Sequence, residues 1–202
     1  MTCLAVITGS TRPGRRGDMV ATWVAATASQ HVAHLAAPVK IELVDLADFG
    51  LPLLEEPAPA MFGQYEYDYT RRWAASIESF DGFVFVTPEY NHSLPAALKN
   101  AIDHVFAEWN DKAAGVVSYG VNGGTRAGEH LRQVLAAVKV ATVRTHVALS
   151  MFDDFAISNP LSPGEFTPRD MQVSAVHDLL DELLSWTRAL QGVRGTAAAV
   201  PA

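Results

Sequence analysis

Residues 3–17 have the sequence CLAVITGSTRPGRRG, an apolar run followed at once by a loop that holds three glycines and three arginines. In α/β proteins, a loop between a strand and the helix that follows it is a common place to bind phosphate. Glycines let backbone N–H groups approach an anion, and arginine guanidinium groups bind phosphate oxygens in pairs. The stretch therefore predicts a first strand, a first helix and an anion site between them. The expected contributors are Ser10, Arg12, Arg15, Arg16 and the backbone at Gly17.

The loop does not match two familiar phosphate motifs. Gly9 and Gly14 have the spacing of a P-loop, but Arg15 and Arg16 occupy the positions of its lysine and its magnesium-binding hydroxyl. The dinucleotide pattern G-x-G-x-x-G fails because Thr11 replaces the second glycine. A single terminal phosphate fits the loop better than a nucleoside triphosphate or a pyrophosphate does.

Composition limits the class of protein. The chain has 202 residues, of which 49% are hydrophobic and 18% charged, with a formal net charge of −7. These values predict one globular domain over residues 1–192 with a flexible tail over 193–202, and they argue against nucleic-acid binding. No apolar run is long enough to span a membrane. The single cysteine, Cys3, excludes an internal disulfide, lies in an apolar strand as a core residue, and favours a cytoplasmic location.

Short runs rich in Val, Ile and Phe alternate with helical patterns, the order typical of a parallel sheet covered on both faces. We expect strands at residues 3–8, 39–45, 82–87, 113–119 and 140–147. Helices are expected at 17–35, 70–79, 93–109, 125–138 and 168–190, the last one capped by Thr167. These five units are compatible with an α/β fold of strand order 2-1-3-4-5, in which the loops after strands 1, 3 and 4 would meet.

The loops after the third and fourth strands are suited to a flat ring. The third strand ends in TPEYNHSLPAALKNAIDH, where Pro88 and Pro95 stiffen the chain and hold its amides in place. The fourth strand ends in SYGVNGGTRA, a second glycine-rich turn whose amides can stabilise negative charge on a ring. We expect the ring to lie between these two loops, with Tyr90 offering a flat face and Asn91 a donor and an acceptor.

Together, GSTRPGRRG, the PEYN and LKNAID segments and SYGVNGGTRA resemble the NADPH-dependent FMN reductase family of flavodoxin-like proteins. The likeness covers roughly residues 3–147. By match of position, the resemblance implies that the phosphate of FMN is held by Ser10, Arg12 and the backbone through Gly17. It implies that the ring is lined by Pro88, Glu89, Tyr90 and Asn91 on one side and by Ser118, Tyr119, Gly120, Gly123 and Gly124 on the other.

The resemblance also implies an activity. Bound FMN would carry hydride from NADPH or NADH to a small acceptor such as a free flavin, a quinone, an azo compound or a metal oxyanion, by a ping-pong mechanism. The cofactor supplies the chemistry, so no catalytic side chain and no metal are expected. His92 is the nearest candidate for a proton relay, and a histidine satisfied by backbone is the simpler interpretation. Relatives often carry glycine at the position of Val121, whose side chain could narrow the space for nicotinamide.

Alternatives remain at this stage. The chain could be a flavodoxin-type one-electron carrier or a non-catalytic FMN-binding module. The family implies a homodimer or homotetramer, and the apolar residues of the helix expected at 93–109 suggest either a subunit interface or ordinary core. Residues 46–69 and 148–166 lack periodicity and predict surface loops, with a lid or a partner surface as the other possibility.

Overall fold

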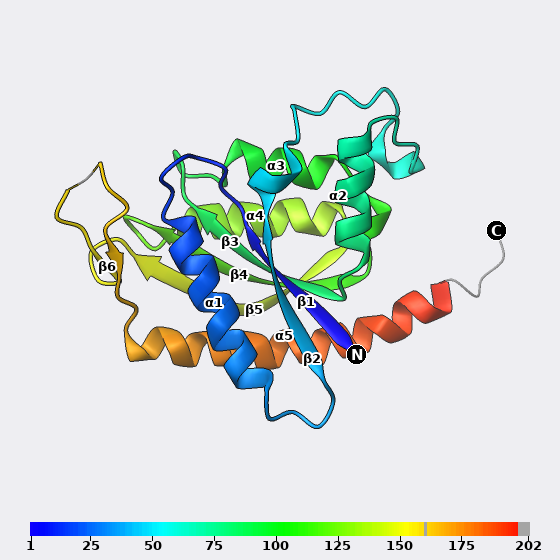
Figure 1. Ribbon diagram of the computed structural model, residues 1–202. Helices are drawn as coiled ribbons and strands as arrows, with labels where there is room; N and C mark the ends of the chain where they lie inside the picture. The colour runs from blue at the N-terminus through cyan, green and yellow to red at the C-terminus, as the bar shows by residue number, and fades with distance from the viewer. Residues whose placement is uncertain (160, 198–202) are drawn as a thin grey trace.

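The computed structural model describes residues 1–159 and 161–197. Its centre is a five-stranded parallel sheet with the order β2-β1-β3-β4-β5 (Figure 1). The strands are β1 (Thr2–Thr8), β2 (Val39–Asp45), β3 (Gly82–Pro88), β4 (Lys112–Gly120) and β5 (Val140–Ser150). This order confirms the flavodoxin-like prediction, and each expected strand is present.

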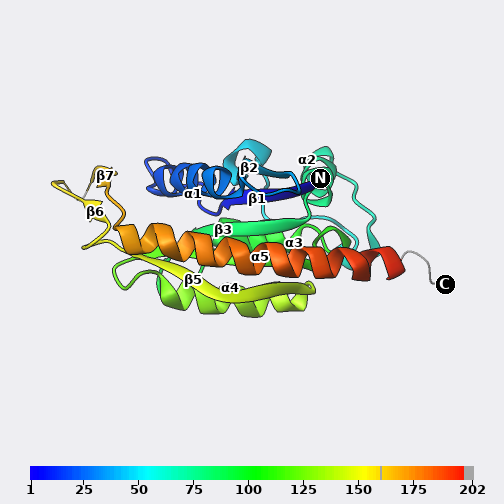
Figure 2. The same ribbon diagram turned by 90° about the horizontal axis from the view of Figure 1, so that it is seen from below.

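Helices cover both faces of the sheet (Figures 1 and 2). One face carries α1 (Gly17–Val32) and α5 (Asp170–Ala197), and the other carries α2 (Asp68–Glu78), α3 (Ala96–Asp103) and α4 (Thr125–Ala137). Alternate strand residues supply the two cores: Leu4 and Val6 face α1 and α5, whereas Ala5 and Ile7 face the other three helices. This alternation follows from the period of two along a strand.

Short elements complete the chain. Three 3-10 turns occur among the described residues, at η1 (Leu46–Phe49), η2 (Ala60–Phe62) and η3 (Ala107–Trp109). β6 (Phe155–Ala156) pairs antiparallel with β7 (Glu165–Phe166) and forms a hairpin before α5. In Figure 2 this hairpin lies at one end of α5 and the C-terminus at the other.

The helix expected at 93–109 is shorter than predicted. α3 ends at Asp103, and Phe106 has a φ of −131°, which is outside the helical region. The apolar residues that suggested a subunit interface, such as Leu98, Ile102 and Trp109, are at most 1% exposed and belong to the core. The interface interpretation of this helix was therefore wrong.

The last helix also differs from its prediction at both ends. α5 begins at Asp170 rather than near Thr167, whose backbone N–H donates to the Asp154 carbonyl at 2.9 Å instead of entering the helix. The helix continues through Ala197, beyond residue 193, where a tail was expected to begin. Residues 198–202 of that expected tail lie outside the described residues.

Candidate functional site

The loop between β1 and α1 packs tightly against the loops beside it. A β-carbon built at Gly9 would lie 2.9 Å from the Val86 carbonyl oxygen, so a larger residue at position 9 would collide with β3. Ser10 is 1% exposed, and its Oγ lies 3.0 Å from the hydroxyl of Tyr90 in the loop after β3. The first two loops are thus joined through these two hydroxyl groups.

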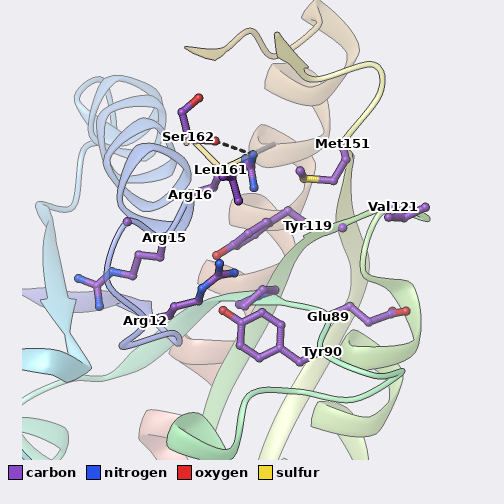
Figure 3. A pocket seen from close by; sticks show the side chains of 13 residues that line it. Arg12, Arg15, Arg16, Glu89, Tyr90, Tyr119, Val121, Met151, Leu161 and Ser162 are labelled. Atoms are coloured by element: carbon purple, nitrogen blue, oxygen red, sulfur yellow. Dashed lines mark hydrogen bonds between the residues drawn. The ribbon is translucent and has the colours of Figure 1, made fainter. Parts of the chain in front are cut away.

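The three arginines of the first loop have different surroundings. Arg15 forms ion pairs with Asp18 and Asp45 and donates to the Ser10 carbonyl, so its guanidinium is fully engaged by protein. Figure 3 shows Arg15 turned away from the cavity and Arg12 pointing into it. Arg12 is exposed, and its guanidinium forms no ion pair or hydrogen bond with any residue that the structure describes. Arg12 is therefore the arginine of this loop that is available to an anion.

Arg16 connects the first loop to a distant segment. Its guanidinium donates to the carbonyl oxygens of Ser162 and Pro163, both at 2.8 Å (Figure 3). These acceptors lie more than 140 residues away along the chain. Arg16 thus secures the tip of the β6–β7 hairpin instead of offering its charge to a ligand.

The loop after β3 contains a tight turn. The backbone N–H and C=O groups of Tyr90 and Ser93 are bonded reciprocally at 2.9 and 3.1 Å. Asn91 and His92 between them have φ values of 49° and 68°, the left-handed conformation required at both central positions of a type I′ turn. Asparagine and histidine are among the non-glycine residues that adopt this conformation most readily. Both residues are exposed at the tip, outside the cavity.

Glu89 supports the site from behind. Its carboxylate accepts the backbone N–H groups of Arg126 and Ala127 at 3.0 and 3.3 Å and pairs with the Arg126 guanidinium at 3.1 Å. This contact satisfies N–H groups in the first turn of α4 and places negative charge at the positive end of the helix. The carboxylate points away from the cavity in Figure 3. Glu89 has a structural use here, as a helix cap.

The turn after β4 is held by buried hydrogen bonds. Ser118 Oγ donates to the Gly123 carbonyl at 2.6 Å, and His146 Nε2 lies 2.8 Å from the same hydroxyl oxygen. Burial lowers the pKa of His146, which favours the neutral imidazole. Gly124 has a φ of 68°, and a β-carbon there would lie 2.8 Å from the Tyr119 carbonyl oxygen. Only glycine fits this position without strain.

These three loops meet at one cavity of about 200 Å³ beyond the carboxyl ends of the strands (Figure 3). Eight of the predicted site residues line it: Arg12, Arg15, Arg16, Pro88, Glu89, Tyr90, Tyr119 and Gly120. Six predicted residues do not line it: Ser10, Gly17, Asn91, Ser118, Gly123 and Gly124. Most of these six fix the conformation of the loops through hydrogen bonds and close packing, and Asn91 lies at an exposed tip.

The sequence prediction missed one wall of the cavity. Met151, Leu161 and Ser162 line it, and all three come from the segment 148–166 that was expected to be a surface loop. Asp154 holds the base of this segment: it is fully buried and accepts from the Ser150 N–H at 2.8 Å and from Arg169 Nε at 3.0 Å. No periodicity marks these residues, so the sequence carried no signal for them. Gly14 and Val121 also line the cavity and were not assigned to the site.

Two other features noted in the sequence lie outside the cavity. Cys3 is half-buried, and its Sγ donates a hydrogen bond to Glu42 Oε1 at 3.3 Å. Burial raises the pKa of its thiol to about 11, so the thiol is not activated as a nucleophile. The described residues contain no group of three or more His, Cys, Asp or Glu side chains placed to hold a metal ion. None of the helices within the described ranges has the length and hydrophobicity needed to cross a membrane.

Comparison with known proteins gives the same fold and a consistent family. A family model described as NADPH-dependent FMN reductase matches residues 2–154. An NAD(P)H-dependent FMN reductase of Schizosaccharomyces pombe is 37% identical over 167 residues, which cover 81% of each chain. A second, of Saccharomyces cerevisiae, is 38% identical over 146 residues, 69% of this chain and 76% of that relative. Among solved structures, the flavoenzyme FerB, an NAD(P)H:acceptor oxidoreductase of Paracoccus denitrificans, has a TM-score of 0.67 at 21% identity, covering 94% of this chain and 98% of that one.

Proposed function

The chain belongs to the NADPH-dependent FMN reductase family, and on that premise we propose that its three-loop cavity holds FMN and serves transfer of reducing equivalents from NAD(P)H to a small acceptor. The protein is an oxidoreductase of the flavodoxin-like fold. The observation that carries the proposal is the convergence of the loops after β1, β3 and β4 on one cavity with an uncommitted guanidinium at one end.

The residues present fit FMN in charge and shape. The anionic end would lie against Arg12 and the N-terminus of α1, where a 16-residue helix contributes its positive end. The ring would lie between Tyr90 and Gly120, with Pro88 and Glu89 contributing backbone. At Gly120 a β-carbon would stand 3.3 Å from the Gly124 N–H nitrogen, so the turn is as compact as its glycines allow. A flat ring can therefore approach the backbone closely.

When bound, FMN supplies the redox chemistry, accepting a hydride from NAD(P)H and delivering it to the acceptor. The protein's part is to bind, orient and exclude water. Part of the cavity lining is apolar, because Val121, Met151 and Leu161 contribute to it. Val121 is also 62% exposed, and we propose that it lies at the open side of the cavity, its mouth, where it would restrict an incoming nicotinamide or acceptor. We propose that both substrates use this mouth in turn, which is ping-pong exchange.

An absorbance experiment tests the proposal. Purified protein mixed with FMN under anaerobic conditions should retain the yellow flavin through gel filtration, and NADH or NADPH should bleach it. The two nicotinamides are compared by stopped flow to determine the preference. Initial rates at several acceptor concentrations should give parallel double-reciprocal lines. Protein that remains colourless after FMN addition, or flavin that neither nicotinamide bleaches, would rule the function out.

We further propose a homodimer or homotetramer. Its support is the connection between η1 and α2, residues 51–67, which stands out from the fold in Figure 1. Leu53, Met61 and Phe62 in this connection are 81%, 64% and 62% exposed. The connection is held in place by hydrogen bonds, among them Asn100 Nδ2 to the Pro52 carbonyl at 2.7 Å. An ordered segment that exposes large apolar side chains is typical of an interface.

A further inference from the structure

Tyr119 lies at the end of β4, and its side chain reaches the loop between β1 and α1. Its ring is 5% exposed and packs in the core between the sheet, α1 and α5. Its hydroxyl reaches the first residue of α1: a β-carbon built at Gly17 would lie only 2.9 Å from the Tyr119 hydroxyl oxygen. The resemblance to the family implied a place for Tyr119 beside the ring. In the structure the side chain instead extends toward the loop between β1 and α1, which holds Arg12, Arg15 and Arg16.

The hydroxyl of Tyr119 makes no hydrogen bond with the residues that the structure describes. The ring is buried, but the hydroxyl oxygen is not sealed in the core, since it is not among the buried polar atoms of the described residues that lack a partner. The hydroxyl of the neighbouring Tyr90, by contrast, is paired with Ser10. Tyr119 lines the cavity, so its free hydroxyl faces the space where a ligand would lie.

The ionisation state of Tyr119 suits a donor. Burial raises the pKa of its phenol well above the ordinary value, so the O–H proton is retained at neutral pH. Arg12 points into the same space (Figure 3), and the helix α1 begins at Gly17 directly beside the hydroxyl. A guanidinium, a phenol O–H and a helix N-terminus are all donors or positive ends, a combination that recognises an anion.

We propose that the Tyr119 hydroxyl donates a hydrogen bond to the phosphate of FMN together with Arg12, so that the phosphate site is built from the loops after both β1 and β4. This assignment rests on the proposed function. The assignment also explains the glycine at position 17, because any side chain there would collide with the Tyr119 hydroxyl and displace it from the phosphate. Tyr119 contributes to selecting FMN over riboflavin, which has the same ring and no phosphate.

The test compares FMN with riboflavin. Dissociation constants for both are measured by quenching of flavin fluorescence on the wild type and on Tyr119→Phe, which removes one oxygen and keeps the buried ring. Tyr65→Phe serves as the matched control, because the Tyr65 hydroxyl bonds Glu108 away from the cavity. We expect Tyr119→Phe to weaken FMN binding roughly tenfold to a hundredfold and to leave riboflavin binding unchanged. The control should change neither constant.

Further readouts separate the possible failures. The urea midpoint of the protein without FMN should be unchanged in Tyr119→Phe, because the hydroxyl has no partner there to lose. Gly17→Ala, which brings a methyl group against the hydroxyl, should also weaken FMN selectively. Equal losses for FMN and riboflavin, or unchanged FMN binding, would overturn the phosphate assignment while leaving the proposed function intact. A wild type that does not bind FMN would instead overturn the proposed function itself.

Discussion

Arg12, Arg15 and Arg16 lie in one loop, yet their contacts separate them. Acidic partners on β2 and α1 neutralise Arg15, and carbonyl groups of the β6–β7 hairpin engage Arg16. The Arg12 guanidinium has no such partner among the described residues and points into the cavity. Because a charged donor already bonded within the protein gains little from a new partner, the binding energy for an anion is concentrated on Arg12.

Arg12→Ala is expected to weaken FMN affinity by one to two orders of magnitude, from the loss of a charge-assisted contact worth about 1.5 to 3 kcal/mol. The dissociation constant is measured by flavin fluorescence. Arg188→Ala, a change at an exposed residue of α5, is the matched control and should bind FMN like the wild type. An Arg12→Ala variant with wild-type affinity would show that the anion lies elsewhere.

The helices derive their positions from contacts with the sheet as much as from their own sequences. α4 packs on β5 where Gly128 faces the ring of His146, and a β-carbon at Gly128 would lie 2.4 Å from His146 Cε1. The His146 ring is restrained in turn by Ser118 at 2.8 Å, so it cannot easily move aside. This contact links the packing of α4 to the glycine turn of the site.

Replacing glycine by alanine should have opposite effects in two helices. Gly128→Ala is expected to destabilise the fold by about 1 to 3 kcal/mol, because the methyl group overpacks against His146. Gly192→Ala in α5, where a β-carbon meets nothing within 4 Å, should stabilise it by about 0.5 to 1 kcal/mol through helix propensity. Urea unfolding measures both. A Gly128→Ala variant as stable as the wild type would mean that the contact between α4 and β5 is looser than described.

Lys112 provides a pH-dependent link between β4 and α2. Its Nζ donates to the Ile77 carbonyl at 2.8 Å, and burial lowers its pKa from 10.5 to about 8. The unfolded chain therefore binds more protons than the folded one between pH 8 and 10.5, so this group's contribution to stability rises with pH across that window. Below pH 8 the cost of burying the ammonium is fully present.

The free energy of unfolding of the wild type, relative to Lys112→Met, should accordingly rise by about 1 kcal/mol from pH 7 to pH 9. Urea unfolding of both proteins at the two pH values measures it. Taking the difference between them cancels the other groups that titrate in this range, such as Cys3, whose raised pKa acts in the opposite direction. A difference that is flat or falls with pH would contradict the assignment.

In the whole molecule, two apolar cores share one sheet, and the cavity lies at the sheet's edge where the loops after β1, β3 and β4 meet. On the surface, the connection of residues 51–67 exposes the large apolar side chains of Leu53, Met61 and Phe62, and Leu54 in it is bonded to Asn100. A single domain over residues 1–192 and a cytoplasmic location stay predictions.

Light scattering coupled to size exclusion is expected to give a mass of two or four chains of 21.8 kDa for the wild type. Combining Met61→Ser with Phe62→Ser should lower that mass toward one chain, because burial of these side chains favours association. Leu161→Ser, on the hairpin, is the control for a general loss of exposed apolar surface. A wild type that elutes as a monomer at micromolar concentration would contradict the proposed assembly.

The sequence by itself predicted the strands and the glycine-rich loops that form the cavity, because strand runs, helical periods and glycine turns are encoded by neighbouring residues. The flavodoxin-like fold and the family were expected from the likeness of the loop motifs to known proteins, and the strand order follows from pairing between distant segments. Only the tertiary structure decided which arginine is free, since Arg15 and Arg16 are engaged by Asp45 and Ser162, far away in the sequence. It also decided the hairpin wall, the end of α3 at Asp103 and the direction of the Tyr119 hydroxyl. Each of these depends on contacts between distant segments, which periodicity along the chain does not record.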